Sequence, residues 1–334
     1  MHTEQVNHAP AISFFMSGAE MPGRPTLGAW LSYGLGSDTD SLPSFVVMTS
    51  VSKGTTCGQI FYDFYWGSGF LPSRFQGVKF RAGGDPVLYL QNPNGITGQE
   101  RRGKLDDLGK HNRMRHAEFG DPEILTRIAQ YEMAYRMQAA VPELIDVKGE
   151  TEATRKLYGL DSKYDPTRTF GMQCLIARRL VEKGVRFIEL TCPRISGNDR
   201  WDAHGGLKKN HGDNSRATDQ PIAGLLRDLK SRGMLKDTLV VWSGEFGRTP
   251  FAQGSNGRDH NPFGFTIWMA GGGAKPGITY GQSDDYGYNL TDKDGNVIKP
   301  NKHKWTPGTM HIHDLNATIL HLLGIDHTRL TYRY

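Results

Sequence analysis

Helical and strand patterns alternate through the second half of this 334-residue chain, and this alternation limits its fold more than any other feature. Residues 169–183 place apolar side chains at helical spacing, and residues 185–190 follow as an apolar strand. A further helix passes through residues 222–229, and two more strands are expected at 238–242 and 265–270. Strands joined by helices through short connections are typical of a mostly parallel central sheet flanked by helices on both faces, so we expect an α/β fold.

The first half of the chain is less regular, and part of it is expected to be carried on the sheet as an insertion or cap. Strands are expected at residues 42–49 and 85–90, and one clear helix at 122–140. The span 51–162 mixes aromatic-rich loops with that helix. We therefore predict a single domain over residues 1–334 that contains an insertion over this span.

Two further segments have distinct local patterns. The polar segment 198–215 is expected to be a connection that leads into the helix through residues 222–229. The last helix is expected over residues 313–324, with Asp314 as its N-cap, because a carboxylate there can accept from the free N–H groups of the first turn.

Composition and charge exclude several classes of protein. The net charge is +5 and the basic residues are scattered, whereas a nucleic-acid-binding protein usually has a concentrated basic face. The cysteines Cys57, Cys174 and Cys192 form no CxxC pair, so neither a zinc knot nor a disulfide framework is indicated. No apolar run is long enough to span a bilayer, and the polar N-terminus does not have the pattern of a signal peptide.

Candidate metal ligands lie next to three of the expected strands. Asp202 and His204 follow the strand 185–190, and their i, i+2 spacing in an extended loop lets both point at one ion. Glu245 follows the next strand, and His260 precedes the third. Functional residues of such sheets gather beyond the carboxyl ends of the strands. Carboxylate and imidazole together suit Zn, Mn or Fe.

Each of these residues also has a plain structural interpretation. Asp202 and His204 can be incidental residues of a polar loop, and Glu245 can pair with Arg248. A lone histidine such as His260 is usually a satisfied loop residue. Three ligand candidates beside three strands of one sheet are a more specific signal than any one of them, so a metal site is predicted.

The order of these motifs resembles that of the alkaline phosphatase and sulfatase superfamily. There too, Asp-x-His is followed by a strand with an acidic residue, and then by Asp-His before another strand. The closing stretch Asp314-Leu-Asn-Ala-Thr-Ile-Leu-His-Leu-Leu-Gly-Ile is similar to a sulfatase-type helix. Stretches such as Gly28-Ala-Trp-Leu-Ser-Tyr-Gly, Gly244-Glu-Phe-Gly-Arg-Thr and Arg258-Asp-His are closer still to the DUF1501 family of sulfatase-like proteins.

The resemblance implies an alkaline phosphatase-like fold and a divalent metal cofactor. Zn is expected, with Mn, Ca and Mg left open. Asp202, His204 and His260 match the ligands of the superfamily's first metal. Glu245 takes the place of an aspartate that serves the second metal, whereas Phe246 stands where that metal's histidine belongs and cannot bind an ion.

The catalytic residues implied by the resemblance are less regular. Superfamily members place a nucleophile about ten residues before a Thr-Gly or Ser-Gly, and the matching frame ends here at Gly18. His8 and Asn7 occupy the expected position: His8 can bind a metal or carry a phosphoryl group, and Asn7 can stabilise an oxyanion, unless both only pack the start of a helix. Arg248 or Arg258 can bind the tetrahedral anion.

Two functions follow as hypotheses. The first is a metal-dependent hydrolase of phosphate or sulfate esters, acting on a small-molecule or glycan ester, with no nucleic-acid partner and no membrane span. The alternative is a catalytically weak, metal-binding relative that recognises anionic glycans or a protein partner. The resemblance also predicts that an N-terminal strand, the C-terminal end and an export signal belong to a longer protein.

Overall fold

The computed structural model describes residues 1–50, 63–82, 86–87, 90–193, 195, 200–298 and 308–333. The helices among them are α1 (His8–Ser17), α2 (Leu27–Leu35), α3 (Gly98–Phe119), α4 (Pro122–Ile145), α5 (Glu152–Leu157), α6 (Asp165–Glu182), α7 (Leu207–Ser231) and α8 (Ile312–Leu322), with the short 3-10 helices η1 (Asp63–Trp66) and η2 (Ser73–Phe75). The strands are β1 (Phe45–Thr49), β2 (Val78–Arg81), β3 (Phe187–Thr191), β4 (Val240–Trp242), β5 (Gly247–Arg248), β6 (His260–Asn261), β7 (Trp268–Ala270), β8 (Gln282–Ser283) and β9 (Leu290–Thr291).

A three-stranded parallel sheet in the order β2-β1-β3 forms the centre of the molecule. Val47 of the middle strand lies opposite Lys79 of β2 and Glu189 of β3. All five residues of β1 are buried, as expected for the middle strand of a sheet that is covered on both faces. The α/β prediction is confirmed in this coarse form.

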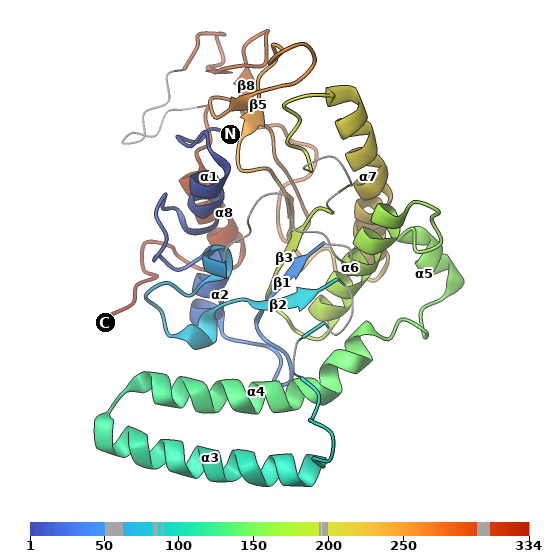
Figure 1. Ribbon diagram of the computed structural model, residues 1–334. Coiled ribbons are helices and arrows are strands. Elements are labelled where there is room, and N and C mark those ends of the chain that lie inside the picture. Colours follow the sequence, from blue (N-terminus) through green and yellow to red (C-terminus); the bar gives the residue numbers. More distant parts are fainter. Residues whose placement is uncertain are drawn as a thin grey trace.

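Helices cover both faces of this sheet (Figure 1). Side chains alternate across a strand, so Val46 and Met48 of β1 point to one face, where they pack with residues of α4 and α6 such as Val141 and Leu180. Phe45 and Val47 of the same strand point to the other face, where they pack with η1 and α1. α2 and α8 share a third apolar cluster on that side.

Gly28 sets how closely α2 approaches the sheet. A Cβ at this position would lie 2.5 Å from a ring carbon of Phe45 and 2.6 Å from one of Phe187. Carbon atoms do not approach so closely, so a larger residue would push α2 away from β1 and β3. The Gly-Ala pair at the start of this helix therefore serves close packing.

The second half of the chain differs from the expected single, mostly parallel sheet. β4 and β7 pair antiparallel, with Val240 opposite Ala270, and the described residues do not join them to the central sheet. The pairs β5–β6 and β8–β9 are also antiparallel. A parallel neighbour needs a crossover, usually a helix, whereas loops and the β5–β6 pair connect β4 to β7. The mostly parallel arrangement is therefore right only for β1, β2 and β3.

The prediction of a polar connection over 198–215 is wrong in its second part, because α7 begins at Leu207. Asn210, Asn214 and Thr218 recur every four residues of this helix and are buried. The Asn214 side chain donates to the Asn210 carbonyl at 2.8 Å, and the Thr218 hydroxyl donates to the Asn214 carbonyl at 2.9 Å. These donors are satisfied within the helix, whereas Asn214 Oδ1 is buried without a partner among the described residues. Polar side chains can be buried when hydrogen bonds offset the loss of water, so polarity did not mark an exposed loop here.

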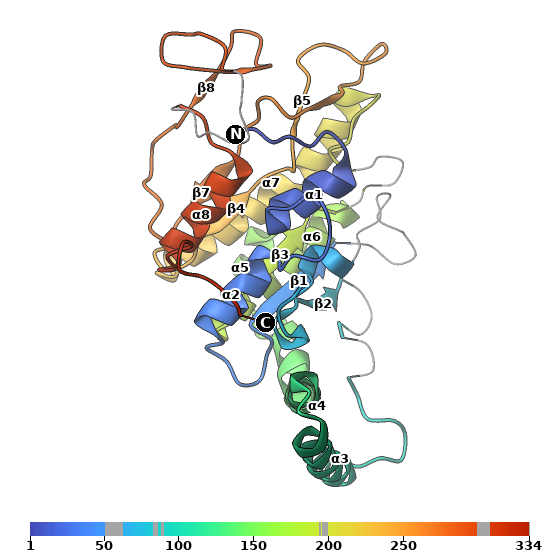
Figure 2. The same ribbon diagram turned by 90° about the vertical axis from the view of Figure 1, so that its left-hand side faces the viewer.

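Helix α3 was not expected from the sequence. It pairs with α4 and projects from the rest of the molecule, as Figures 1 and 2 show from two sides. Gly109 is its one buried residue, so it has no apolar stripe for a helical pattern to reveal. Its start is instead stabilised by a capping box of Thr97 and Glu100, and Arg102 binds Glu132 of α4 through two hydrogen bonds of 2.8 and 2.6 Å.

The span 51–162, predicted as an insertion or cap, has parts in the body of the protein as well as in this projection. β2 joins the central sheet, and α4 packs against it. The strand expected at 85–90 lies partly outside the described residues, and Cys57 lies outside them altogether. None of the described helices combines the length and the apolarity that crossing a membrane requires.

The last helix begins slightly earlier than expected. His311 is the N-cap of α8, and Asp314 is the third helical residue, whose carboxylate accepts from the backbone N–H of His311 at 2.9 Å. Asp314 therefore acts in a capping box and is not the N-cap.

Candidate metal centre

Four side chains from three separate stretches of chain meet at one place. His8 begins α1, Asp202 and His204 lie between β3 and α7, and His260 begins β6. One ligand atom from each lies within 4.8 Å of the others. Asp202, His204 and His260 were the ligands expected for one metal, and His8 was expected to bind a metal or carry a phosphoryl group, unless it only packed the start of a helix.

Pairing between loops holds this group together. The backbone N–H of Arg258 donates to the Ala203 carbonyl at 2.8 Å, which ties the loop before β6 to the loop that carries Asp202 and His204. In the β5–β6 pair, His260 lies opposite Arg248. Asp202 and His204 are more than fifty residues from His260 in the sequence, and these backbone contacts bring the two segments to one site.

The distances within this group suit one small cation. His204 Nε2 lies 3.0 Å from Asp202 Oδ1 and 3.1 Å from His260 Nε2, and His8 Nε2 lies 3.3 Å from Asp202 Oδ2. Tetrahedral ligand bonds of about 2.0–2.2 Å place ligand atoms roughly 3.3–3.6 Å from one another. Small adjustments of the four side chains therefore bring them to ligand spacing.

Each of the three imidazoles is oriented through its Nδ1 atom, which lies against an oxygen acceptor. The pairs are His8 with Glu245 Oε1 at 2.5 Å, His204 with Gln253 Oε1 at 2.5 Å, and His260 with the Val6 carbonyl oxygen. Because these oxygens accept, Nδ1 donates, and the Nε2 lone pair of a neutral ring is left for a cation. All three Nε2 atoms face Asp202. Metal-binding histidines are commonly oriented in this way.

The centre concentrates negative charge. Burial acts to raise the pKa of Asp202, but hydrogen bonds from His260 and His8 and the charge of Arg248 hold it well below its usual range. Burial likewise acts to lower the pKa of His8, but its hydrogen bonds to Asp202 and Glu245 raise it to about 9. The two carboxylates thus stabilise a positive charge between them, which a proton or a metal ion can supply.

Glu245, the fourth expected ligand, lies behind His8 and outside the group of four. Its carboxylate orients the imidazole and does not complete the group. The simpler interpretation, an ion pair between Glu245 and Arg248, is not observed either. Arg248 Nη2 instead binds Asp202 Oδ1 at 2.5 Å.

Phe246 closes one side of the centre. Its ring stacks on His260 with 4.3 Å between centroids and lies 5.0 Å from the ring of His8. An apolar ring here offers no ligand to a second ion. It also restricts the rotation of two of the imidazoles.

A cavity of about 570 Å³ adjoins the centre. Arg248 lines it, and its Nη1 atom is buried without a hydrogen-bond partner among the described residues. The indoles of Trp201 and Trp242 also line it, with perpendicular rings 6.5 Å apart. A buried guanidinium N–H with no protein acceptor is suited to bind an anion that enters this cavity.

The structure leaves two of the proposed catalytic residues outside this cavity. Asn7 is the N-cap of α1, is exposed, and makes no side-chain capping hydrogen bond. Arg258 is not among the residues that line the cavity, and its Nη1 donates to the Gly257 carbonyl at 2.8 Å. Of the two arginines that were left open as anion-binding residues, Arg248 is the one at the cavity.

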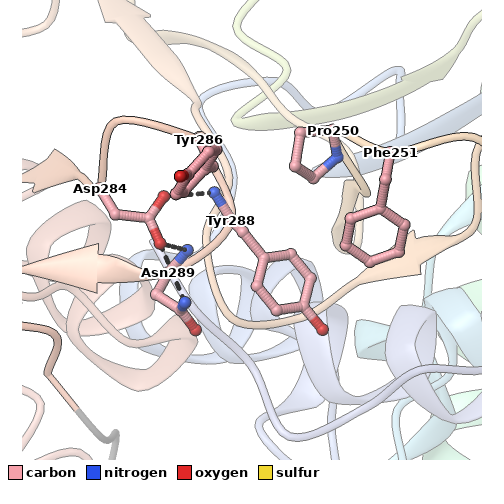
Figure 3. Close-up of a pocket in the computed structure, with 6 residues that line it drawn as sticks. All are labelled: Pro250, Phe251, Asp284, Tyr286, Tyr288 and Asn289. Atoms are coloured by element: carbon pink, nitrogen blue, oxygen red, sulfur yellow. Dashed lines mark hydrogen bonds between the residues drawn. The ribbon is translucent and has the colours of Figure 1, made fainter.

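A second, shallower cavity of about 320 Å³ lies between the loops around β5 and β8 (Figure 3). The Asp284 carboxylate in it accepts from the backbone N–H groups of Tyr288 and Asn289 at 2.8 and 3.0 Å and from the Asn289 side chain at 2.9 Å. These bonds hold the loop that presents Tyr286 and Tyr288. Because the carboxylate is already satisfied, this cavity is not the metal centre.

Two residues of the site were missed in the sequence. Gln253, which orients His204, lies in a loop with no pattern that singles it out. Trp242 could have been found, because it is the last residue of β4 and side chains at the carboxyl ends of strands reach functional sites.

Comparison with known proteins finds one family and no individual relative. No curated protein and no solved structure matches the chain. The family model described as "Protein of unknown function (DUF1501)" matches residues 1–334, the whole length of the sequence. The chain therefore belongs to the DUF1501 family.

Proposed function

We propose that this protein is a metal-dependent hydrolase of phosphate or sulfate monoesters, with an alkaline phosphatase-like fold. One observation carries the proposal: the Nε2 atoms of His8, His204 and His260 face Asp202 while their Nδ1 atoms are held by oxygen acceptors. Arg248 lines the cavity beside them, and its Nη1 atom has no hydrogen-bond partner among the described residues, which suits an anionic substrate. The reaction class itself comes from the likeness to the alkaline phosphatase and sulfatase superfamily.

Zinc is the metal that this ligand set favours. The group contains three imidazole nitrogens and one carboxylate. Ca²⁺ and Mg²⁺ prefer sites built from oxygen ligands, whereas imidazole suits Zn²⁺ and other transition metals. We therefore propose one Zn²⁺ held by His8, Asp202, His204 and His260.

The chain's own residues would divide the remaining work. When bound, the ion would supply Lewis-acid catalysis, for which it would have to accept an ester oxygen or a water in addition to its four protein ligands. Arg248 holds Asp202 through Nη2 and binds an oxygen of the ester anion through Nη1. Glu245 keeps the His8 ring in position through Nδ1. Phe246 keeps that side of the centre free of water.

The two arginines give the first test. With zinc present, the wild-type protein is expected to hydrolyse p-nitrophenyl phosphate or p-nitrophenyl sulfate. Arg248→Gln should lower kcat/KM by about 10- to 150-fold, because a hydrogen bond to a charged group contributes about 1.5–3 kcal/mol. Arg258→Gln is the matched control and should stay within about twofold, because this side chain lies outside the cavity.

Metal content is measured on the same samples, so that loss of the ion is not mistaken for loss of anion binding. Equal losses in the two arginine variants would contradict the role of Arg248. Absence of turnover of both esters by the zinc-loaded wild type would overturn the proposed function. It would favour the alternative, a binding protein without catalytic activity.

Phe246→His gives a second test, of the number of metal ions. The wild type is expected to hold one zinc per chain, because Phe246 contacts His260 and His8 where a further ligand would be needed. The variant adds an imidazole beside Glu245 and should raise the zinc content above one equivalent. Phe246→Leu keeps the position apolar and should leave the content at one. Elemental analysis of the three proteins measures the number of zinc ions per chain. Two zinc ions per chain in the wild type would show that the prediction is wrong.

A further inference from the structure

Glu189 is a carboxylate in an unexpected place, and the metal centre does not use it. It lies in the middle of β3, opposite Val47 of β1. Its strand neighbours Ile188 and Leu190 pack in the apolar cluster with α4 and α6. Side chains alternate along a strand, so Glu189 points to the other face, where it lines the cavity of about 570 Å³ beside the metal centre.

One oxygen of the Glu189 carboxyl, Oε2, is buried without a hydrogen-bond partner among the described residues. Burial raises the pKa of Glu189 to about 8, and no neighbouring charge is among the causes. The group is therefore mostly protonated at pH 7, and a protonated carboxyl both donates and accepts hydrogen bonds. An unpaired buried polar group destabilises the protein, so its presence calls for an explanation.

The rest of the cavity offers a polar contact at one residue and apolar contacts at two others. The ester anion would be bound near the metal centre, where Arg248 lines the cavity and its Nη1 lacks a hydrogen-bond partner among the described residues. Trp201 and Trp242 provide flat apolar surfaces in the same cavity. A small number of polar groups within an apolar lining usually orients a ligand and selects it. A neutral carboxyl matches a hydroxyl group, which likewise donates and accepts.

We infer that Glu189 is a specificity-determining residue that binds a second hydroxyl group on the alcohol half of the ester. The preferred substrates are then monoesters of polyols, such as a hexose esterified at one position, in preference to esters of simple alcohols. This inference rests on the proposed hydrolase function and names the class of its substrate.

The test compares two substrates that differ in their hydroxyl groups. Glucose 6-phosphate and glucose 6-sulfate carry hydroxyls on the ring, whereas cyclohexylmethyl phosphate and sulfate have a similar shape without them. Glu189→Leu removes the polar group at similar size and should lower kcat/KM for the glucose esters by about 10- to 100-fold, mainly through KM. The cyclohexylmethyl esters should change by no more than about twofold. Glu189→Gln keeps a donor and an acceptor and should restore most of the loss.

A binding measurement separates this inference from the proposed function. Titration of the zinc-loaded protein with each ester is followed by tryptophan fluorescence, because Trp201 and Trp242 line the cavity. If the wild type binds the glucose esters, binds them less tightly after Glu189→Leu, and turns over none, the hydrolase proposal is wrong and the role of Glu189 stands.

Three results would overturn the inference. The first is an equal loss for both substrate types in Glu189→Leu, and the second is no loss for either. The third is a wild type that neither binds nor hydrolyses any glucose ester. If Glu189→Leu does not fold, Glu189→Asp takes its place, because it withdraws the carboxyl by one methylene and should weaken the glucose esters selectively.

Discussion

Asp202→Asn is expected to remove zinc from the purified protein while the fold remains. Asp202 is the carboxylate at the middle of the group of four, and it contacts His8, His204 and His260. An amide in its place carries no charge to offset a dication. Loss of an outer partner alone costs about 10- to 100-fold in metal affinity, so loss of this direct ligand should cost at least as much. His204→Ala should have an effect of the same kind.

The measurement is zinc content by elemental analysis after gel filtration, with circular dichroism to confirm folding. Asp219→Asn and His111→Ala are the matched controls, because both side chains are exposed and lie outside the group of four. Both controls should retain one equivalent. A full equivalent in Asp202→Asn would show that the metal lies elsewhere.

Gly257→Ala is expected to disorganise the same centre without touching a ligand side chain. A Cβ at Gly257 would lie 1.9 Å from the carbonyl oxygen of His204 and 2.2 Å from its carbonyl carbon. Backbone cannot yield as a flexible side chain does, so the loop that carries Asp202 and His204 must move. Overpacking of this kind lowers the free energy of unfolding by about 1–3 kcal/mol. Zinc affinity should fall with it, since the ligand atoms lose their common point.

Gly205→Ala provides the control from the same contact. A Cβ at Gly205 meets no described atom within 4 Å, and its φ lies outside the left-handed range that favours glycine. The free energy of unfolding of this variant should lie within about 0.5 kcal/mol of the wild-type value, and the variant should retain its zinc. Chemical denaturation and metal titration of the two variants give the comparison. Similar behaviour of the two glycine variants would contradict the close approach of the two loops.

Local patterns predicted the elements that bury one apolar face and missed those that do not. The helix at 169–183 and the strand at 185–190 correspond to α6 and β3 within a few residues, because their apolar residues repeat at the period of the element. α3 has no such repeat, and its stability comes from its capping box and its contacts with α4. The first part of α7 buries Asn210, Asn214 and Thr218, so hydropathy revealed only its apolar second half.

Pairing between strands was not contained in those patterns. The strands at 238–242 and 265–270 were recognisable from their apolar residues, and β4 and β7 lie within them. Whether two strands pair parallel or antiparallel depends on the connection between them, and no periodicity within either strand reports it. The return through β5 and β6 makes β4 and β7 antiparallel.

The sequence by itself determined the types of ligand and the loops that carry them. Asp202, His204 and His260 were predicted because each lies beside an apolar strand and has a side chain suited to one kind of cation. Tertiary structure alone decided which ring nitrogen of each histidine faces the centre, through oxygen acceptors on Glu245 and Gln253 and the Val6 carbonyl. The Nε2 atom of a histidine is free to bind a cation when Nδ1, across the ring, donates a hydrogen bond. The acceptor of that hydrogen bond lies in another part of the chain, so the local sequence does not reveal it.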